Sequence, residues 1–531
     1  MIDVLIIGSG GAGLTAALSA QTAGASVLVV GKTYPTNSQT SMAQGGINAA
    51  LGNINEDHVS SHIADTIKSA HGLCDDDMVR KMCADAPQTI EWLEQLGVPF
   101  SRLDNGKSGK ETVAQHQMGG ASAKRACYAQ DYTGLKILHT LYDTCLKEKI
   151  DFLDEHYLLN LIIKDGVSKG ATFLNIRTGE LKQIDAKSVV IATGGYASLY
   201  HGFTTNAYGS TGDGVAAVLR AGGAVSDMEF IQFHPTAFKH SAILISESAR
   251  GEGGYLLNSD NERFVDELKP RDEVARAIFS QLQNNKEVFL DLRHLGEKKL
   301  METLPQEVAL CKLHEQVNPS LELIPIKPVA HYSMGGIDVD YALEVNGIKG
   351  CFAVGECSNA KVHGANRLGG NSLLEISAFG KFAGENAYKH SIYASSKSAD
   401  DKQLQEDKAY IETIYKKENR INFYEKRVSL GKLFYQKVGI VRENKALHLA
   451  LEEVISVQVA LTQMGIEDKH QANNSNLIDF LEFSNALLLA PTIISSAIAR
   501  DESRGAHFKV GFEEENKDLQ KHIVLQWKKE Q

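Results

Sequence analysis

The sequence has few cysteines, and they form no pattern that would build a metal site. Its 531 residues include seven cysteines, an odd number, and no two of them are spaced as C-x-x-C. This argues against a disulfide framework and against an iron–sulfur or zinc site within the chain. We therefore expect no metal site here, and any relay of single electrons must lie on another polypeptide.

Long apolar runs are also missing. No stretch approaches the roughly 20 consecutive apolar residues that are needed to span a bilayer. The apolar run from Val4 to Ile7 is short, follows no basic segment and leads into a glycine turn, so it resembles neither a signal peptide nor an anchor. We expect a protein that is cytoplasmic or lies at the cytoplasmic face of a membrane.

Positive charge is in deficit. The chain carries 55 Lys and Arg against 66 Asp and Glu, a net charge of −11. This balance disfavours nucleic acid as a partner, because phosphate binding needs a basic surface. Hydrophobic content of 43% and charged content of 23% are typical of a globular protein, and the length predicts two or three domains. An anionic ligand would have to be held by a few placed Arg and His side chains.

The N-terminus has the pattern of a dinucleotide-binding unit. An apolar strand is followed by a glycine turn, a helix from about Leu14 to Thr22 and a second strand at 26–30, and the turn contains Gly8, Gly10, Gly11 and Gly13. Such glycines let the backbone approach a pyrophosphate at the helix N-terminus. The acid expected after the second strand is missing, since Gly31 and Lys32 stand there. Ribose recognition must come from elsewhere, and a merely tight strand–helix turn is the alternative.

Three later segments favour FAD over NAD. Residues 186–195 read as an apolar strand that ends in a glycine turn, and residues 350–356 read as another such strand that ends in the acid Glu356. Between them, "TGDG" at 211–214 precedes a helix. A nucleotide site assembled from segments so far apart suits FAD, which is long enough to contact them all. Three independent corners of an α/β sheet are the alternative interpretation.

Five polar motifs between Phe230 and Glu375 place His or Arg beside glycine or proline. They read "FIQFHPT", "SESARGEGG", "KPRDEVARAI", "HYSMGG" and "HGANRLGGNSLLE". Each puts a cation at the end of an element, where backbone N–H groups are also free. One such motif alone would most simply be structural, but five in succession indicate a binding site.

These motifs, together with "LDLRHLGEKKL", resemble the flavoprotein subunits of fumarate reductase and succinate dehydrogenase from Met1 to about Phe508. The same superfamily includes L-aspartate oxidase. The resemblance implies an α/β fold with three parts. They are a Rossmann-like FAD-binding domain at 1–226 and 347–396, an inserted α+β capping domain at 227–346, and a helical domain with a short tail at 397–531. Apolar residues at i, i+3 and i+4 beyond residue 420 also predict helices there.

By the same resemblance, the substrate is a four-carbon dicarboxylate, fumarate or succinate, held by His234, Ser246, His331 and Arg367. Arg271 would exchange a proton with one carbon while the flavin exchanges hydride with the other. Glu247 and Arg250 match a proton relay behind Arg271, and a structural ion pair is the alternative for these two. Arg is suited to carboxylate binding because its guanidinium pairs bidentately.

The cofactor contacts implied by the resemblance extend along the chain. Besides the turn glycines they are Lys32, Ser38, Gln39, Thr40, Gly45, Gly46, Asp213, Glu356, Ser372 and Leu373. Asp213 could equally cap the helix that follows it. Most family members have a His, covalently bonded to the flavin, where this chain has Gln39. An amide nitrogen is not nucleophilic, so the sequence predicts non-covalent FAD, a lower flavin potential and fumarate reduction as the favoured direction, unless another His such as His363 forms the bond.

The electron partner is predicted by resemblance alone. "ESRGAH" at 502–507 matches a motif near the iron–sulfur subunit, which implies such a partner and, beyond it, a membrane or soluble electron carrier. The chain length is closer to that of L-aspartate oxidase, the alternative function. That enzyme has Glu before a Gly-Gly pair in its substrate loop, whereas this chain has Met118, where fumarate reductases usually have Phe. An ammonium group would find no anion there.

Overall fold

The computed structural model describes residues 1–104, 111–395 and 397–527. Its largest sheet has the order β8-β2-β1-β11-β10-β9, and β18 also pairs with β11. The parallel strands are β1 (Ile2–Ile7), β2 (Val27–Val30), β8 (Asp151–Leu153), β11 (Leu181–Ile191) and β18 (Cys351–Ala353). β9 (His156–Lys164) and β10 (Val167–Asn175) extend the sheet as antiparallel strands. The carboxyl ends of β1, β2, β11 and β18 therefore meet at one edge, where parallel sheets bind ligands.

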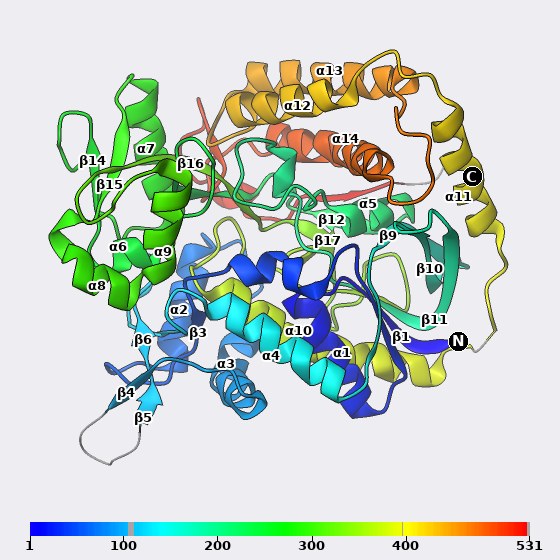
Figure 1. Cartoon of the computed structure of the whole chain (residues 1–531), viewed down its shortest axis with the longest axis horizontal. Helices are drawn as coiled ribbons and strands as arrows, with labels where there is room; N and C mark the ends of the chain where they lie inside the picture. Colours follow the sequence, from blue (N-terminus) through cyan, green and yellow to red (C-terminus); the bar gives the residue numbers. More distant parts are fainter. Residues whose placement is uncertain (105–110, 396, 528–531) are drawn as a thin grey trace.

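Helices cover this sheet closely. The helix of the glycine turn, α1 (Gly11–Ala23), packs against α10 (Asn371–Tyr393), and Figure 1 shows them crossing below the sheet. A Cβ added at Gly384 of α10 would lie 2.2 Å from the carbonyl oxygen of Ala16, so this contact requires glycine. The neighbouring helices are α2 (Val59–Ser69), α3 (Asp76–Leu96), α4 (Thr133–Lys147) and α5 (Asp213–Arg220).

Short strands tie the loops of this first domain together. One sheet contains β3 (Ile47–Asn48), β6 (Gln115–His116) and β7 (Ala126–Cys127), and another pairs β4 (Arg102–Asp104) with β5 (Glu111–Val113). A third contains β12 (Ala224–Ser226), β17 (Gly336–Asp338), β19 (Ser358–Asn359) and β22 (Val524–Gln526). Short 3-10 helices lie at Ala197–Leu199, Arg293–Leu295, Leu461–Gln463 and Lys517–Leu519, and a single π-helical turn lies at Cys311–Glu315.

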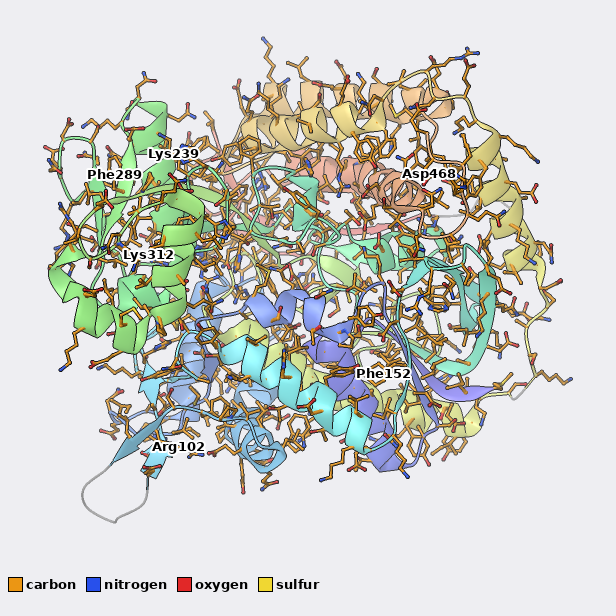
Figure 2. All side chains as sticks on the ribbon, viewed as in Figure 1. Arg102, Phe152, Lys239, Phe289, Lys312 and Asp468 are labelled. Carbon is orange, nitrogen blue, oxygen red and sulfur yellow. The ribbon has the colours of Figure 1, made fainter. Side chains whose placement is uncertain are left out.

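The inserted segment forms a cap with its own antiparallel sheet, at the left of Figure 1. Its strands are β13 (Ile231–Phe238), β14 (Tyr255–Asn258), β15 (Val288–Asp291) and β16 (Ile324–Ser333), in the order β13-β16-β15-β14. Its helices are α6 (Ser248–Gly251), α7 (Arg271–Gln283), α8 (Gly296–Thr303) and α9 (Pro305–Leu310). Lys239, Phe289 and Lys312 mark this part in Figure 2. Its separate hydrophobic core runs from Phe238 to Ile326, inside the predicted bounds of 227–346. β17, also inside these bounds, pairs with β12 of the first domain.

The C-terminal region contains α11 (Lys402–Lys416), α12 (Phe423–Lys437), α13 (Asn444–Ala460) and α14 (Ser475–Ala499). In length and composition α14 could cross a membrane, but 72% of its most apolar window is buried against its neighbours. Its apolar composition is explained by this core position. Beyond α14, β21 (Phe508–Lys509) pairs with β20 (Val441–Arg442), and β22 joins β12. The last described residues therefore pack on the first domain.

Candidate active site

A cavity lies between the carboxyl edge of the large sheet and the cap. It is lined by the glycine turn, the loop at 33–48, the start of α10 and the cap residues His234, Ser246, Glu247 and Arg271. Nineteen of the residues predicted from the sequence line it, and the exceptions are Gly13 and Arg250. The structure therefore brings together segments from Gly8 to Leu373 of the sequence around one space.

The glycine turn has the geometry that a nucleotide site requires. Gly8 has a positive φ of 113°, and a Cβ there would lie 2.1 Å from the carbonyl oxygen of Ala192. A Cβ on Gly13 would lie 1.9 Å from the carbonyl oxygen of Gly8, so Gly13 permits the tight turn and does not line the cavity. The N-terminus of α1, with Gly11 as its first residue, faces the cavity and offers a positive dipole end to a phosphate.

Lys32 and Asp213 line the cavity, but they are bonded to each other. Lys32 Nζ lies 2.6 Å from Asp213 Oδ2 and 2.8 Å from Glu482 Oε1 of α14. Burial alone would lower the pKa of Lys32, but the two carboxylates raise it. Asp213 lies in the first turn of α5 with Gly212 as the N-cap residue, and it makes no side-chain capping bond. This ion pair joins the nucleotide end of the cavity to α14, a contact that no local pattern predicts.

The loop at 33–48 borders the cavity and is more regular than its composition suggests. It contains two short 3-10 turns, Pro35–Asn37 and Gln39–Met42. Within the described part of the chain, the buried oxygens Ser38 Oγ and Thr193 Oγ1, both from cavity-lining residues, have no hydrogen-bond partner. Buried polar atoms without partners are rare and indicate a missing ligand or water. Hydroxyl groups placed here fit FAD, which carries both donors and acceptors along its length.

Gln39 connects this loop to the substrate end of the cavity. Its Oε1 accepts a hydrogen bond of 3.1 Å from the Ala207 N–H, and its Nε2 lies 3.5 Å from the Thr205 carbonyl oxygen. The Thr205 hydroxyl in turn lies 2.7 Å from His331 Nδ1. Gln39 therefore holds the loop that orients a predicted substrate histidine. Thr205 carries no signal in the sequence and was not predicted.

The two histidines lie together. The ring centroids of His234 and His331 are 5.1 Å apart, and both rings are buried. Burial, followed by nearby positive groups that include Arg271, lowers both pKa values well below the usual range, so both rings are neutral. His234 Nδ1 lies 2.9 Å from the Thr236 carbonyl oxygen, which can only accept. The Thr236 backbone N–H also lies 3.3 Å from the same Nδ1, so the two contacts do not fix which ring nitrogen of His234 carries the proton.

Arg271, Glu247 and Arg250 are in contact. Arg271 opens α7, and its Nε donates to Glu247 Oε2 over 2.8 Å, while its Nη2 contacts the same oxygen. Arg250 Nη2 lies 3.4 Å from Glu247 Oε1. Burial would raise the pKa of Glu247, but Arg271 and Arg250 lower it to about 2, so the carboxylate is ionised. Glu247 therefore forms ion pairs with both arginines and lies between them, which is also the order that a proton relay from Arg250 to Arg271 would require.

Arg367 differs from the other buried cations of the cavity because it has no carboxylate partner among the described residues. It is 4% exposed, its guanidinium stacks 4.2 Å above the Tyr332 ring, and among the described residues no carboxylate lies within 4.0 Å of it. Its Nε has no partner among those residues. Burial, and next the nearby Arg271, lower its pKa to about 10. An unpaired guanidinium in a cavity is a binding site for an anion.

Gln232 was not predicted, although it organises both arginines. Its Oε1 accepts from Arg271 Nη1 at 3.0 Å and from Arg367 Nη2 at 3.1 Å. Its Nε2 donates to the Asn366 Oδ1 and to the Arg367 carbonyl oxygen, each at 2.8 Å, which fixes the orientation of the amide. A neutral oxygen thus holds two mutually repelling guanidiniums in one geometry.

Replacement of Gln232 by Leu should lower kcat/KM for the dicarboxylate by about 10- to 100-fold. A loss of this size is about 1.4–2.7 kcal/mol, the scale of one hydrogen bond to a charged group, because water can replace part of what the two arginines lose. Steady-state fumarate reduction with a reduced viologen dye measures it. Gln183→Leu is the control, since Gln183 bonds to Asp185 and to the Asp400 carbonyl outside the cavity. Equal kinetics in the two variants would contradict the role of Gln232.

The remaining predicted cofactor residues lie on the opposite wall. Glu356 follows β18, its Oε1 accepts from the Ser333 N–H at 3.0 Å, and burial raises its pKa to about 7. Ser372 and Leu373 stand in the first turn of α10. His363, the alternative site of a covalent bond, bonds to Glu375 at 2.9 Å and is not among the residues lining the cavity.

Comparison with known proteins agrees with this geometry. Residues 3–373 match the family described as FAD binding domain, and residues 427–531 match the fumarate reductase flavoprotein C-terminal family. The chain is 36% identical to the fumarate reductase flavoprotein subunit of Haemophilus influenzae, over 97% of this chain and 90% of that one. It is 39% identical to the succinate dehydrogenase flavoprotein subunit of Coxiella burnetii, over 98% and 94%.

A solved flavoprotein structure of Escherichia coli quinol fumarate reductase superposes with a TM-score of 0.91 at 35% identity, covering 98% of this chain and 94% of that one. The predicted fold class and the predicted FAD cofactor are confirmed by these matches. The chain belongs to the family of fumarate reductase and succinate dehydrogenase flavoprotein subunits, FAD-dependent oxidoreductases that act on a CH–CH bond.

Proposed function

We propose that this chain interconverts fumarate and succinate and that fumarate reduction is its better-catalysed direction. The observation that carries the dicarboxylate assignment is the charge of the substrate end of the cavity, whereas the direction rests on Gln39, which cannot form a covalent bond to the flavin. Arg271 and, behind it, Arg250 pair with Glu247, while Arg367 has no carboxylate within 4.0 Å among the described residues, so these four side chains carry two net positive charges. A dicarboxylate dianion would balance both charges.

Substrate binding is assigned to Arg367, His331, Ser246 and His234. Arg367 offers its free Nε to one carboxylate. His331 can present an Nε2–H, because the Thr205 hydroxyl can donate to its Nδ1. His234 lies beside His331, with 5.1 Å between the ring centroids, and adds a second imidazole to the same wall of the cavity. The cap and the first domain each supply part of this set, so the substrate would be held between them.

Proton transfer is assigned to Arg271. Bound FAD supplies the two-electron redox chemistry, and the protein supplies orientation and a proton. Arg271 Nη1 is held by Gln232, while Nε and Nη2 face Glu247. After Arg271 gives up its proton, Arg250 passes a proton to the ionised Glu247, Glu247 passes it on to Arg271, and Arg250 regains a proton from solvent. Glu247 holds no proton at rest, so it serves as a transient carrier.

The relatives support a complex at a membrane. They are flavoprotein subunits by name, which implies partner subunits. We place the chain in a complex with an iron–sulfur subunit, peripheral at the cytoplasmic face of the membrane. The alternative function is L-aspartate oxidase. Met118 is buried, apolar and part of the cavity wall, so it offers no anion to the ammonium group of aspartate, which argues against the oxidase.

A purified preparation supplied with reduced viologen dye tests the function. Fumarate should be reduced quickly, while iminoaspartate and oxygen should be poor acceptors, and an iron–sulfur protein should co-purify from the native source. Faster oxidation of the reduced flavin by oxygen than by fumarate would instead support the oxidase.

FAD should be bound without a covalent link. Gln39 occupies the loop position that carries the bonded His in most relatives, and both polar atoms of its amide already contact the 205–207 loop. Acid precipitation should release intact FAD, and a denaturing gel should show no fluorescent polypeptide. Gln39→Ala should weaken FAD binding without changing the kind of bond. A fluorescent band in the unmodified protein would contradict this prediction.

A further inference from the structure

Glu307 is a buried acid that the mechanism above does not use. It lies in α9 of the cap, is 1% exposed, and accepts a hydrogen bond of 3.0 Å from the backbone N–H of Ser246 through its Oε1. Its carboxyl group also interacts with the side-chain amide of Gln44, from the loop that borders the cavity. Glu307 therefore touches a predicted substrate residue on one side and the first domain on the other.

A second buried acid meets the same helix from the first domain. Asp131, which precedes α4, is fully buried, and its Oδ2 accepts from the backbone N–H groups of Gln306 at 2.8 Å and Glu307 at 3.1 Å. These two bonds fasten the start of α9 to the first domain. The two carboxyl groups thus lie at one contact between the cap and the domain beneath it.

The hydrogen bonding of this cluster is incomplete in a specific way. Gln44 Oε1, Asp131 Oδ1 and Glu307 Oε2 are all buried and without a partner among the described residues. All three are acceptors, and in the same part of the chain no cation lies within 4.0 Å of either carboxyl group. Two buried carboxylates without a cation are strongly disfavoured, whereas a proton on one of them removes a charge and supplies a donor.

The proton is better placed on Glu307 than on Asp131. Asp131 accepts two backbone N–H bonds, which stabilise its ionised form, whereas Glu307 accepts one backbone N–H bond beside its contact with the Gln44 side-chain amide. We propose that Glu307 is a positioning residue that carries this proton at neutral pH, holds the Ser246 backbone in place and keeps the cap against the Gln44 loop. The proposal rests on the proposed function only in that Ser246 binds the dicarboxylate.

The pH dependence follows from the groups around Glu307. Asp131 is the charged group that faces it from the first domain, Gln44 and Ser246 are neutral, and Cys311 lies one turn further along its own segment. Burial, with a smaller contribution from Asp131, raises the pKa of Glu307 to about 8. Above that pH a second negative charge forms at the contact, so the cap and Ser246 should loosen and the KM for fumarate should rise.

Glu307→Gln tests the proposal, because the amide is neutral at every pH and still offers one acceptor and a donor. In the unmodified holoenzyme the KM for fumarate should rise about fivefold between pH 8 and pH 9 as the single proton is lost. In Glu307→Gln that rise should disappear. Glu315→Gln, a buried acid of the same cap segment that pairs with His240, should behave like the unmodified protein. The same rise in Glu307→Gln and the unmodified protein would overturn the proposal.

Thermal unfolding provides a readout that does not depend on activity. Between pH 5 and pH 8 the folded state would hold one proton more than the unfolded chain, so raising the pH should destabilise the unmodified protein relative to Glu307→Gln. A constant difference in Tm across this range would show that Glu307 is ionised, and would overturn the proposal. If fumarate is not turned over at all, the proposed function fails, while the Tm comparison still decides whether Glu307 carries the proton.

Discussion

Arg271→Lys is expected to keep FAD and to bind dicarboxylates while losing at least about 100-fold in kcat, the scale of removing a positioned general acid. Arg271 uses three nitrogens at once, two toward Glu247 and one toward Gln232. A lysine ammonium is a point charge and cannot reproduce this fork. The positive charge of the site would remain, but the proton donor would no longer face the substrate.

Rates of fumarate reduction and a separate dicarboxylate titration of the bound flavin distinguish these two effects. Arg276→Lys is the matched control, since Arg276 lies on the same helix and bonds to Asp272 and the Gly505 carbonyl outside the cavity. A kcat for Arg271→Lys within about fivefold of the unmodified protein would remove Arg271 from the proton-transfer step.

The glycine turn can be recognised from the sequence because the constraints on it are local. Gly8 must adopt a positive φ, and Gly13 must sit against the Gly8 carbonyl, so only glycine fits. Strand, turn and helix are adjacent in the chain, and their pattern is therefore visible. Arg271 and Arg367 are assigned for a different reason. They lie in motifs specific enough to identify a family, and physics alone would not have given their roles.

Neutral polar residues were missed because their importance lies entirely in tertiary contacts. Gln232 resembles any glutamine in a strand, and its role becomes apparent only when Arg271 and Arg367 approach it from two domains. Thr205 is likewise distant in sequence from His331. Glu307 gives no signal at all, because a charged residue in a short helix is ordinarily solvated. β17 lies within the predicted bounds of the cap and joins a sheet with β12 and β19, a pairing that the sequence cannot show.

Arg367→Ala should weaken dicarboxylate binding by about 2–5 kcal/mol, the scale measured when one partner of a buried charge pair is removed. The side chain has no carboxylate of its own within 4.0 Å in the described parts of the chain, so its charge is available to a ligand. Its Gln232 contact and the Tyr332 ring fix its direction without neutralising it.

Because Arg367 lacks a carboxylate partner, the effect of Arg367→Ala on the thermal stability of the protein can also be predicted. Because the guanidinium is buried and unpaired, its removal should not lower the Tm of the ligand-free protein, and FAD should stay bound. Titration of the bound flavin with fumarate or a non-reacting dicarboxylate gives the change in Kd, and Gln183→Leu again serves as a control outside the cavity. Weakened binding with an unchanged Tm would identify Arg367 as a ligand group. A Kd within twofold of the unmodified protein would show that the anion binds elsewhere, whereas a large fall in Tm would mean that Arg367 mainly supports the fold.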